Sequence, residues 1–350
     1  MEDGLLKKLK IGLATAGLTI FSLTNFNSAK AQENYIPKYN TTTHYIIKEI
    51  QKENTLITPE ILDRAIDLSK EIITKQNYTE QEARNLMKKI DSTIFKQNPD
   101  LDDKSLSYNK SLIYLAIAEE NNLPLYPVSS LDQIFVRWDA KRDGHKASNP
   151  NNPINQGDFN WDPIKLKFIN DNEYTSLTSG LMDFEAIEKG IYLKNLDKKE
   201  LLAVAYWQEA LTLDKMQRYG EAIEYANKSL ELNPNYPRAY QIRGNCLTNL
   251  GYLLQKKEFY ESAIEDYSKA QELNFHPENQ YAIGFNLYRL EKYDEAEEYY
   301  NKALNIFENK PRYLAARYLL YTKTNQKEKA ERDLKKLEIL KENSQQIKKN

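Results

Sequence analysis

The residues YGEAIEYANKSLELNP (219–234) decide the fold of the C-terminal half, because their pattern recurs twice downstream. It returns as YESAIEDYSKAQELN (260–274) and as YDEAEEYYNKALNI (293–306). Each copy has an aromatic residue, an alanine three residues later and a second small residue seven further on; these small residues are Ala222 and Ser229, Ala263 and Ala270, and Ala296 and Ala303. Small side chains at this spacing let two antiparallel helices approach closely, so the pattern predicts stacked helical hairpins.

The pattern resembles the tetratricopeptide repeat over about residues 201–341. Gly244 and Gly284 match the small position of the first helix in each hairpin, and Pro234 matches the closing turn. The resemblance implies a solenoid of four repeats over 199–345, whose last repeat (311–340) keeps Ala330 but is rich in lysine and glutamate, as a solvent-facing cap should be. The middle repeat carries an insertion between Leu250 and Lys257 of about two helical turns, which predicts a longer helix.

The resemblance also implies that the first helices of the repeats line a concave groove. The groove positions fall on Trp207, Leu211, Gln241, Asn245, Asn249, Tyr281, Phe285, Tyr288 and Arg289. Aromatic rings and amides suit a protein or peptide partner, because rings supply contact area and amides bind backbone. The alternative is that several of these aromatic residues pack between helices. The carboxylate-clamp subtype needs lysine and asparagine where this chain has Trp207 and Leu211, so capture of a peptide C-terminus is not predicted.

The region before the repeats has a different pattern. Thr58 and Pro59 predict a helix start, Thr79 with Glu82 has capping-box spacing, and SLIYLAIAEENN (111–122) predicts a buried helix. Strands are expected over 123–128, 134–138 and 158–162, with an exposed loop over 139–157. Residues 32–57 are expected to be a linker. The predicted fold class is therefore mainly α, with an α+β domain over 58–195 ahead of the helical solenoid.

The stretches SLIYLAIAEENNLPLY (111–126), QIFVRWD (133–139) and FNWDP (159–163) resemble the transglutaminase-like, papain-like thiol domain over about residues 100–165. In that family a cysteine nucleophile begins the buried helix, a histidine base precedes the Phe-Val-Arg strand, and an asparagine or acid on the next strand orients the histidine. This chain has Ser107 at the cysteine position, Gln133 at the histidine position, and Asn160 or Asp162 at the orienting position.

These replacements imply a degenerate domain with no catalytic residue, in a chain that is not an enzyme. An amide cannot take a proton from a nucleophile, and a serine without a base is neutral at physiological pH. Two alternatives stay open. One is a weak amide or ester hydrolase, or acyl transferase, that uses Ser107; the other is an inactive cleft that still holds a peptide.

The N-terminus has the pattern of a signal peptide. Three lysines (7, 8 and 10) precede an apolar run from Ile11 to Leu23, followed by Ala29-Lys30-Ala31. The run is shorter than the roughly 20 residues that span a bilayer, so residues 1–31 are expected to be cleaved before Gln32. This predicts an exported chain, periplasmic or extracellular, with no stable membrane span after cleavage.

Composition limits the remaining functions. The 350 residues carry a net charge of −2 with no basic stripe, which argues against nucleic acid as a partner. Cys246 is the one cysteine, and its helical apolar surroundings predict a buried side chain. His44 and His276 are expected at exposed or turn positions, and His145 in the loop after the second strand. Asp100, Asp102 and Asp103 lack the glycine and glutamate of a calcium loop, so neither a metal nor a cofactor is expected.

Overall fold

The computed structural model describes residues 36–50, 57–74, 78–97, 107–130, 134–139, 159–162, 167–169 and 184–347. Its N-terminal part contains helices α2 (Thr42–Ile50), α3 (Pro59–Ile72), α4 (Glu80–Gln97), α5 (Ser107–Glu120) and α7 (Phe184–Glu188). Both predicted helix starts are present. Thr58 Oγ1 accepts the Ile61 backbone N–H at 3.4 Å, and Thr79 and Glu82 form the reciprocal bonds of a capping box.

A four-stranded antiparallel sheet follows α5. Its strands β1 (Leu125–Ser129), β2 (Ile134–Trp138), β3 (Phe159–Asp162) and β4 (Lys167–Ile169) are neighbours in chain order. The helix α5 covers one face, where Ser111 Oγ donates to the Ile134 carbonyl at 2.9 Å. On the same face Trp161 Nε1–H donates to the Tyr114 hydroxyl at 2.9 Å. Strand β4 was not predicted, because three residues are too few to show an alternating pattern.

The C-terminal part is a solenoid of helical hairpins, as the repeat pattern predicts. Its helices are α8 (Lys198–Lys215), α9 (Tyr219–Leu232), α10 (Pro237–Leu254), α11 (Lys257–Leu273), α12 (Pro277–Arg289), α13 (Tyr293–Ile306), α14 (Pro311–Lys323) and α15 (Lys327–Ile347). Each hairpin turns through a residue with positive φ: Gln217, Gln255, Glu291 and Asn325. The left-handed conformation ends the first helix sharply, so its partner can fold back along it.

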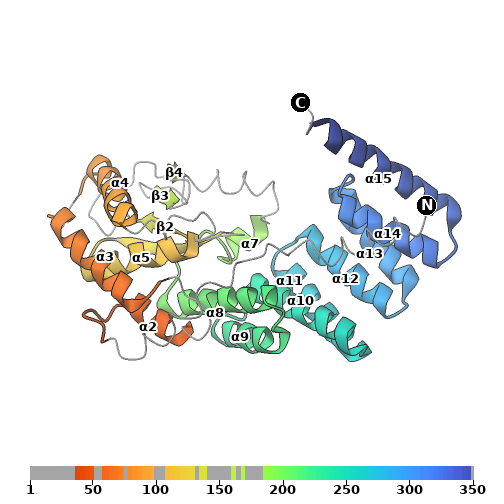
Figure 1. Ribbon diagram of the computed structural model, residues 1–350, viewed down its shortest axis with the longest axis horizontal. Coiled ribbons are helices and arrows are strands. Elements are labelled where there is room, and N and C mark those ends of the chain that lie inside the picture. The colour runs from red at the N-terminus through yellow and green to blue at the C-terminus, as the bar shows by residue number, and fades with distance from the viewer. Residues whose placement is uncertain are drawn as a thin grey trace.

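The two parts share one hydrophobic core. Figure 1 shows α2 to α5 at one end of the solenoid, where α2 contacts α8, with the later hairpins continuing away from them. Leu193 and Leu196 donate backbone hydrogen bonds to Ser129 and Pro127, which joins the chain just before α8 to the edge of β1. A capping box of Asp197 and Glu200 then starts α8. Within the described residues, no helix combines the length and apolar character needed to cross a bilayer.

The prediction of a linker over 32–57 is wrong for the segment that α2 occupies. Ile46, Ile47 and Ile50 of α2 are at most 2% exposed and belong to the shared core. The Tyr206 hydroxyl of α8 donates to Glu49 Oε2 at 3.2 Å, so α2 also contacts the first repeat. Helix α2 is therefore a packed element of the N-terminal part.

Candidate protein-interaction face

The candidate site is the A-helix face, meaning the side chains on the first helix of each hairpin: α8, α10, α12 and α14. Contacts between successive first helices run along it. The Arg238 guanidinium lies 5.6 Å from the centre of the Trp207 ring, and that of Arg312 lies 4.4 Å from the Tyr281 ring. Gln241 Nε2 donates to Asn279 Oδ1 at 2.8 Å. These contacts make one continuous row from four hairpins.

Two of the predicted groove positions are core residues. Trp207 is 8% exposed and meets the Tyr236 ring edge-on at 5.8 Å. Tyr281 is 3% exposed and stacks on Tyr313 with ring centres 5.1 Å apart. These two rings therefore pack between helices, and they are too deeply buried to contact a ligand. Leu211 is partly buried against the shared core.

The remaining predicted positions keep accessible surface. Asn245 is exposed, and its Oδ1 accepts the Tyr267 hydroxyl at 2.6 Å. The others are partly exposed: Gln241, Asn249, Phe285, Tyr288 and Arg289. By contrast, Ala263 and Ala296 on the second helices are fully buried. The accessible amides and rings therefore gather on the first helices, while small residues fill the packing between helices.

Two arginine networks hold consecutive helices in place behind this face. Arg243 of α10 donates two bonds to the Asp266 carboxylate, at 2.8 and 2.6 Å, and one to Asn227 Oδ1 at 2.6 Å. Arg317 of α14 repeats the arrangement with an aspartate and an asparagine, Asp333 and Asn301. Each network joins three helices, and the forked guanidinium fixes their relative position. The sequence signal, an asparagine 16 residues before each arginine, was missed.

A hollow of about 280 Å³ lies where the first helices of the second to fourth repeats end. It is lined by Gln255, Lys257, Tyr260, Tyr288, Arg289, Glu291, Tyr293 and Lys323. The sequence pattern predicted Tyr288 and Arg289 as site residues but not Lys257 and Lys323. The available signal was the insertion in the second repeat, which ends at Lys257.

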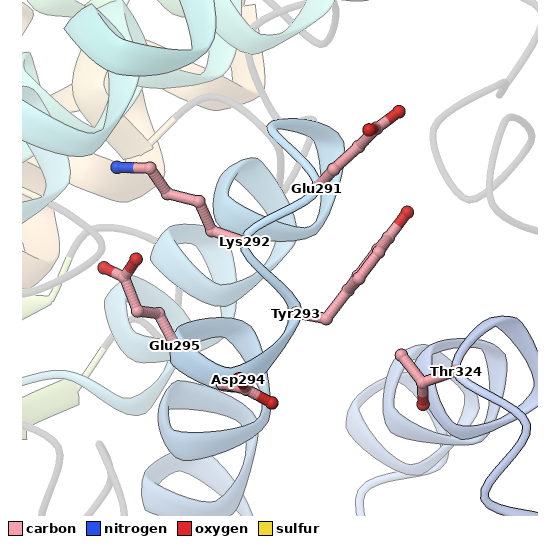
Figure 2. A pocket seen from close by; sticks show the side chains of 6 residues that line it. All are labelled: Glu291, Lys292, Tyr293, Asp294, Glu295 and Thr324. Carbon is pink, nitrogen blue, oxygen red and sulfur yellow. The ribbon is translucent and has the colours of Figure 1, made fainter.

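A second hollow adjoins the first at the turn between α12 and α13. Figure 2 shows Glu291 and Tyr293 projecting to the same side of this turn, the side on which Thr324, the residue that follows α14, also lies. Lys292 and Glu295 point to the other side of the turn. Three carboxylates, those of Glu291, Asp294 and Glu295, line this second hollow, which gives it a charge opposite to that of the first.

In the N-terminal part, the structure describes the surroundings of Asn160 and Asp162, the positions matched to the orienting residue. Helix α5 begins at Ser107, and Gln133 lies outside the described residues. Asn160 is 1% exposed, and its Oδ1 accepts from Arg137 Nε at 2.8 Å. Because side chains alternate along β3 and Trp161 faces α5, both Asn160 and Asp162 lie on the opposite face of the sheet. Arg137 also donates to the Leu193 carbonyl at 2.9 Å, so Asn160 helps to hold the chain leading to α8.

The two histidines and the cysteine that the structure describes have structural roles. His44 is 4% exposed, with Nε2 3.2 Å from Asp63 Oδ1, so the expectation of an exposed or turn position is wrong. Burial lowers its pKa. His276 accepts the Glu278 backbone N–H at the start of α12, a turn position as expected. Cys246 is fully buried, and burial raises the pKa of its thiol.

Among the described residues, no group of three or more histidine, cysteine or acidic side chains is placed to hold a metal ion. Asp100, Asp102, Asp103 and His145 lie outside these residues, as do residues 1–35 with the expected signal peptide.

Comparison with known proteins identifies the repeats. Residues 203–236 and 277–310 match one model of the tetratricopeptide repeat, and residues 239–276 match another. Among curated proteins, the chain is similar to the DnaJ homolog subfamily C member 7 homolog of Dictyostelium discoideum, with 38% identity over 74 residues. That match covers 21% of this chain and only 12% of the relative's length.

Three solved structures are among those that match part of the chain. MamA has 21% identity and a TM-score of 0.37, over 41% of this chain and 81% of that one. YrrB, described as a TPR protein with an unusual peptide-binding site, has 22% identity and a TM-score of 0.34, over 44% and 71%. TTC0263 of Thermus thermophilus has 18% identity and a TM-score of 0.35, over 40% and 81%. By the matches to the family models, the hairpins over residues 203–310 are tetratricopeptide repeats in a mainly helical protein.

Proposed function

We propose that this chain is an adaptor that binds a protein or peptide partner through its A-helix face. The observation that carries the proposal is the contrast between accessible and buried positions. Asn245, Phe285 and Tyr288 keep accessible surface on the first helices, whereas Ala263 and Ala296 are fully buried. Aromatic rings contribute contact area at small entropic cost, and amides pair with the backbone of an extended peptide.

Site-specific photocrosslinking tests this proposal. A photoreactive phenylalanine analogue is placed at position 245 on the face and, as a control, at Lys302, an exposed residue of α13. Position 245 is expected to give a discrete adduct with a protein from the source organism, and position 302 to give none. The same adducts from both positions would contradict the proposal.

The proposal includes export of the chain. It rests on the sequence of residues 1–31 alone, in which three lysines precede a short apolar run and Ala29-Lys30-Ala31. Protein recovered from the source organism is expected to begin at Gln32. Intact-mass measurement decides this, because a mass that still includes residues 1–31 would contradict cleavage.

We also propose that the N-terminal part is a transglutaminase-like domain without its thiol machinery. A buried helix followed by an antiparallel sheet supports this likeness, and Ser107 and Gln133 stand at the nucleophile and base positions. The engagement of Asn160 with Arg137 further supports a structural role. Hydrolysis of a p-nitrophenyl ester is expected to be equal in the wild type and in Ser107→Ala. A rate lost only in Ser107→Ala would favour the alternative, a hydrolase that uses this serine.

A further inference from the structure

The insertion in the second repeat builds an exposed apolar tip, defined here as Tyr252, Leu253 and Leu254. Their exposed fractions are 57%, 61% and 53%. Helix α10 has 18 residues, whereas α12 and α14, which begin at the equivalent proline, have 13. The added turns carry the tip to the end of the α10–α11 hairpin (Figure 1). Adjacent large apolar side chains at such exposure are typical of an interaction surface.

The first hollow lies at the base of this tip. The Arg289 guanidinium is 5.3 Å from the Tyr252 ring, and Arg289 Nε donates to the Tyr260 hydroxyl at 3.1 Å. Arg289 therefore connects the tip to the hollow, which Gln255 and Tyr260 also line. Apolar surface and polar hollow form one continuous site.

The hollow has an excess of positive charge. Lys257, Arg289 and Lys323 line it, against the single carboxylate of Glu291. None of the three cations forms an ion pair within the described part of the chain, although other surface lysines do, such as Lys329 with Glu297 at 2.8 Å. Cations that line one hollow suit a carboxylate, and the tip beside them suits large apolar side chains.

A peptide fits this site better than a membrane surface does. A flat bilayer cannot enter a hollow of about 280 Å³, whereas a side chain of a peptide can. Two exposed acids, Glu258 and Glu261, follow the tip on α11 and would repel an anionic bilayer.

We propose that the tip and the hollow together bind a peptide segment of a protein partner in which an acidic residue is flanked by large apolar residues. The acidic side chain enters the hollow near Lys257 and Lys323, and the apolar residues cover Leu253 and Leu254. The inference rests on the proposed function, because Tyr288 and Arg289 belong to both the A-helix face and the hollow. It adds the chemistry of the partner and a contact outside the repeat pattern.

Selection from a phage-displayed library of random dodecapeptides on the immobilised protein tests this inference. Enriched sequences are expected to place aspartate or glutamate beside leucine, phenylalanine, tyrosine or tryptophan. The affinity of the most enriched peptide is then measured by fluorescence polarisation. Two double variants are each expected to weaken binding at least tenfold: Leu253→Ser with Leu254→Ser, and Lys257→Glu with Lys323→Glu.

Matched controls lie on α15, where Ile339 is 49% exposed and Lys335 is exposed. Ile339→Ser and Lys335→Glu are expected to bind like the wild type, and thermal melts check that all variants are folded. No enrichment, enriched peptides without acids, or unchanged affinity in either double variant would overturn the inference. So would tip-dependent binding only to phosphatidylglycerol vesicles, or dimerisation that Leu253→Ser abolishes.

Two further variants, Asn245→Ala and Phe285→Ala on the A-helix face, separate this inference from the proposed function. A selected peptide that depends on Asn245 and Phe285 but not on the tip leaves the A-helix face as a binding site and overturns the tip site. A peptide that depends on neither set contradicts both.

Discussion

Glu209 of α8 is a buried acid at the position where the second and fourth repeats have Arg243 and Arg317. It stands immediately before Ala210, as Arg243 stands before Gly244, but its side chain is 5% exposed and its Oε1 has no hydrogen-bond partner among the described residues. Burial raises its pKa from the ordinary 4.5 to about 7. The arginine networks of α10 and α14 thus have no counterpart in the first repeat.

The raised pKa of Glu209 makes stability depend on pH. Between about pH 4.5 and 7 the folded chain holds a proton that the unfolded chain has lost, so the free energy of unfolding falls as pH rises. Glu209→Gln is expected to compare with the wild type in the same way at pH 4 as a neutral side chain would, and to gain up to about 3 kcal/mol of stability relative to the wild type between pH 4 and pH 8. Urea unfolding at both pH values measures this, with exposed Glu295→Gln as the control. An equal difference at both pH values would contradict it.

At the scale of elements, the close approach of paired helices depends on a glycine. A Cβ added to Gly284 of α12 would lie 2.9 Å from the Tyr300 ring and 3.2 Å from the Ala296 carbonyl oxygen on α13. A Cβ on Gly220 of α9 would meet nothing within 4 Å. The same substitution should therefore have opposite effects at the two positions.

Gly284→Ala is expected to lower the free energy of unfolding by about 1–3 kcal/mol, because it overpacks the contact between α12 and α13. Gly220→Ala is expected to raise it by up to about 1 kcal/mol, since alanine favours a helix and meets no neighbour. Chemical denaturation of both variants beside the wild type gives the comparison. If Gly284→Ala is as stable as Gly220→Ala, the tight contact is not real.

The elements that the sequence predicted are those whose signal is local. Small residues at fixed helical spacing identify the hairpins, and threonine caps identify two helix starts. Three elements were missed, among them α7, which has only five residues. Helix α2 has only nine residues, and strand β4 has three, so neither shows enough of its period.

Burial in the candidate site could not be predicted so well. The ring of Tyr281 is covered by Tyr313 from the next hairpin and that of Trp207 by Tyr236, contacts that exist only after the repeats stack. The burial of His44 likewise depends on a contact between distant segments, because its partner Asp63 lies on another helix, α3. Repeat position gives the direction of a side chain, but its neighbours decide whether a ligand can reach it.

For the whole molecule, the shared core implies that the N-terminal part and the solenoid stabilise each other. Ile47 of α2 is fully buried in that core. Ile47→Ala is expected to lower the free energy of unfolding by about 2–5 kcal/mol. The midpoint of denaturant unfolding should fall in two signals. One is tryptophan fluorescence, to which Trp138 and Trp161 contribute, and the other is far-ultraviolet circular dichroism, which is dominated by helices. Exposed Ile36→Ala is the control. A shift in only one signal would mean that the two parts unfold independently.

A binding isotherm for the partner that position 245 captures tests most directly whether the A-helix face is the binding site. Asn245→Ala and Phe285→Ala are each compared with the wild type and with Lys302→Ala, and a thermal melt accompanies every isotherm. Each face variant is expected to melt near the wild-type temperature and to lose about 2 kcal/mol of binding free energy, roughly a thirtyfold weaker affinity, while Lys302→Ala binds normally. Wild-type affinity in both face variants would contradict the claim that the A-helix face is the binding site.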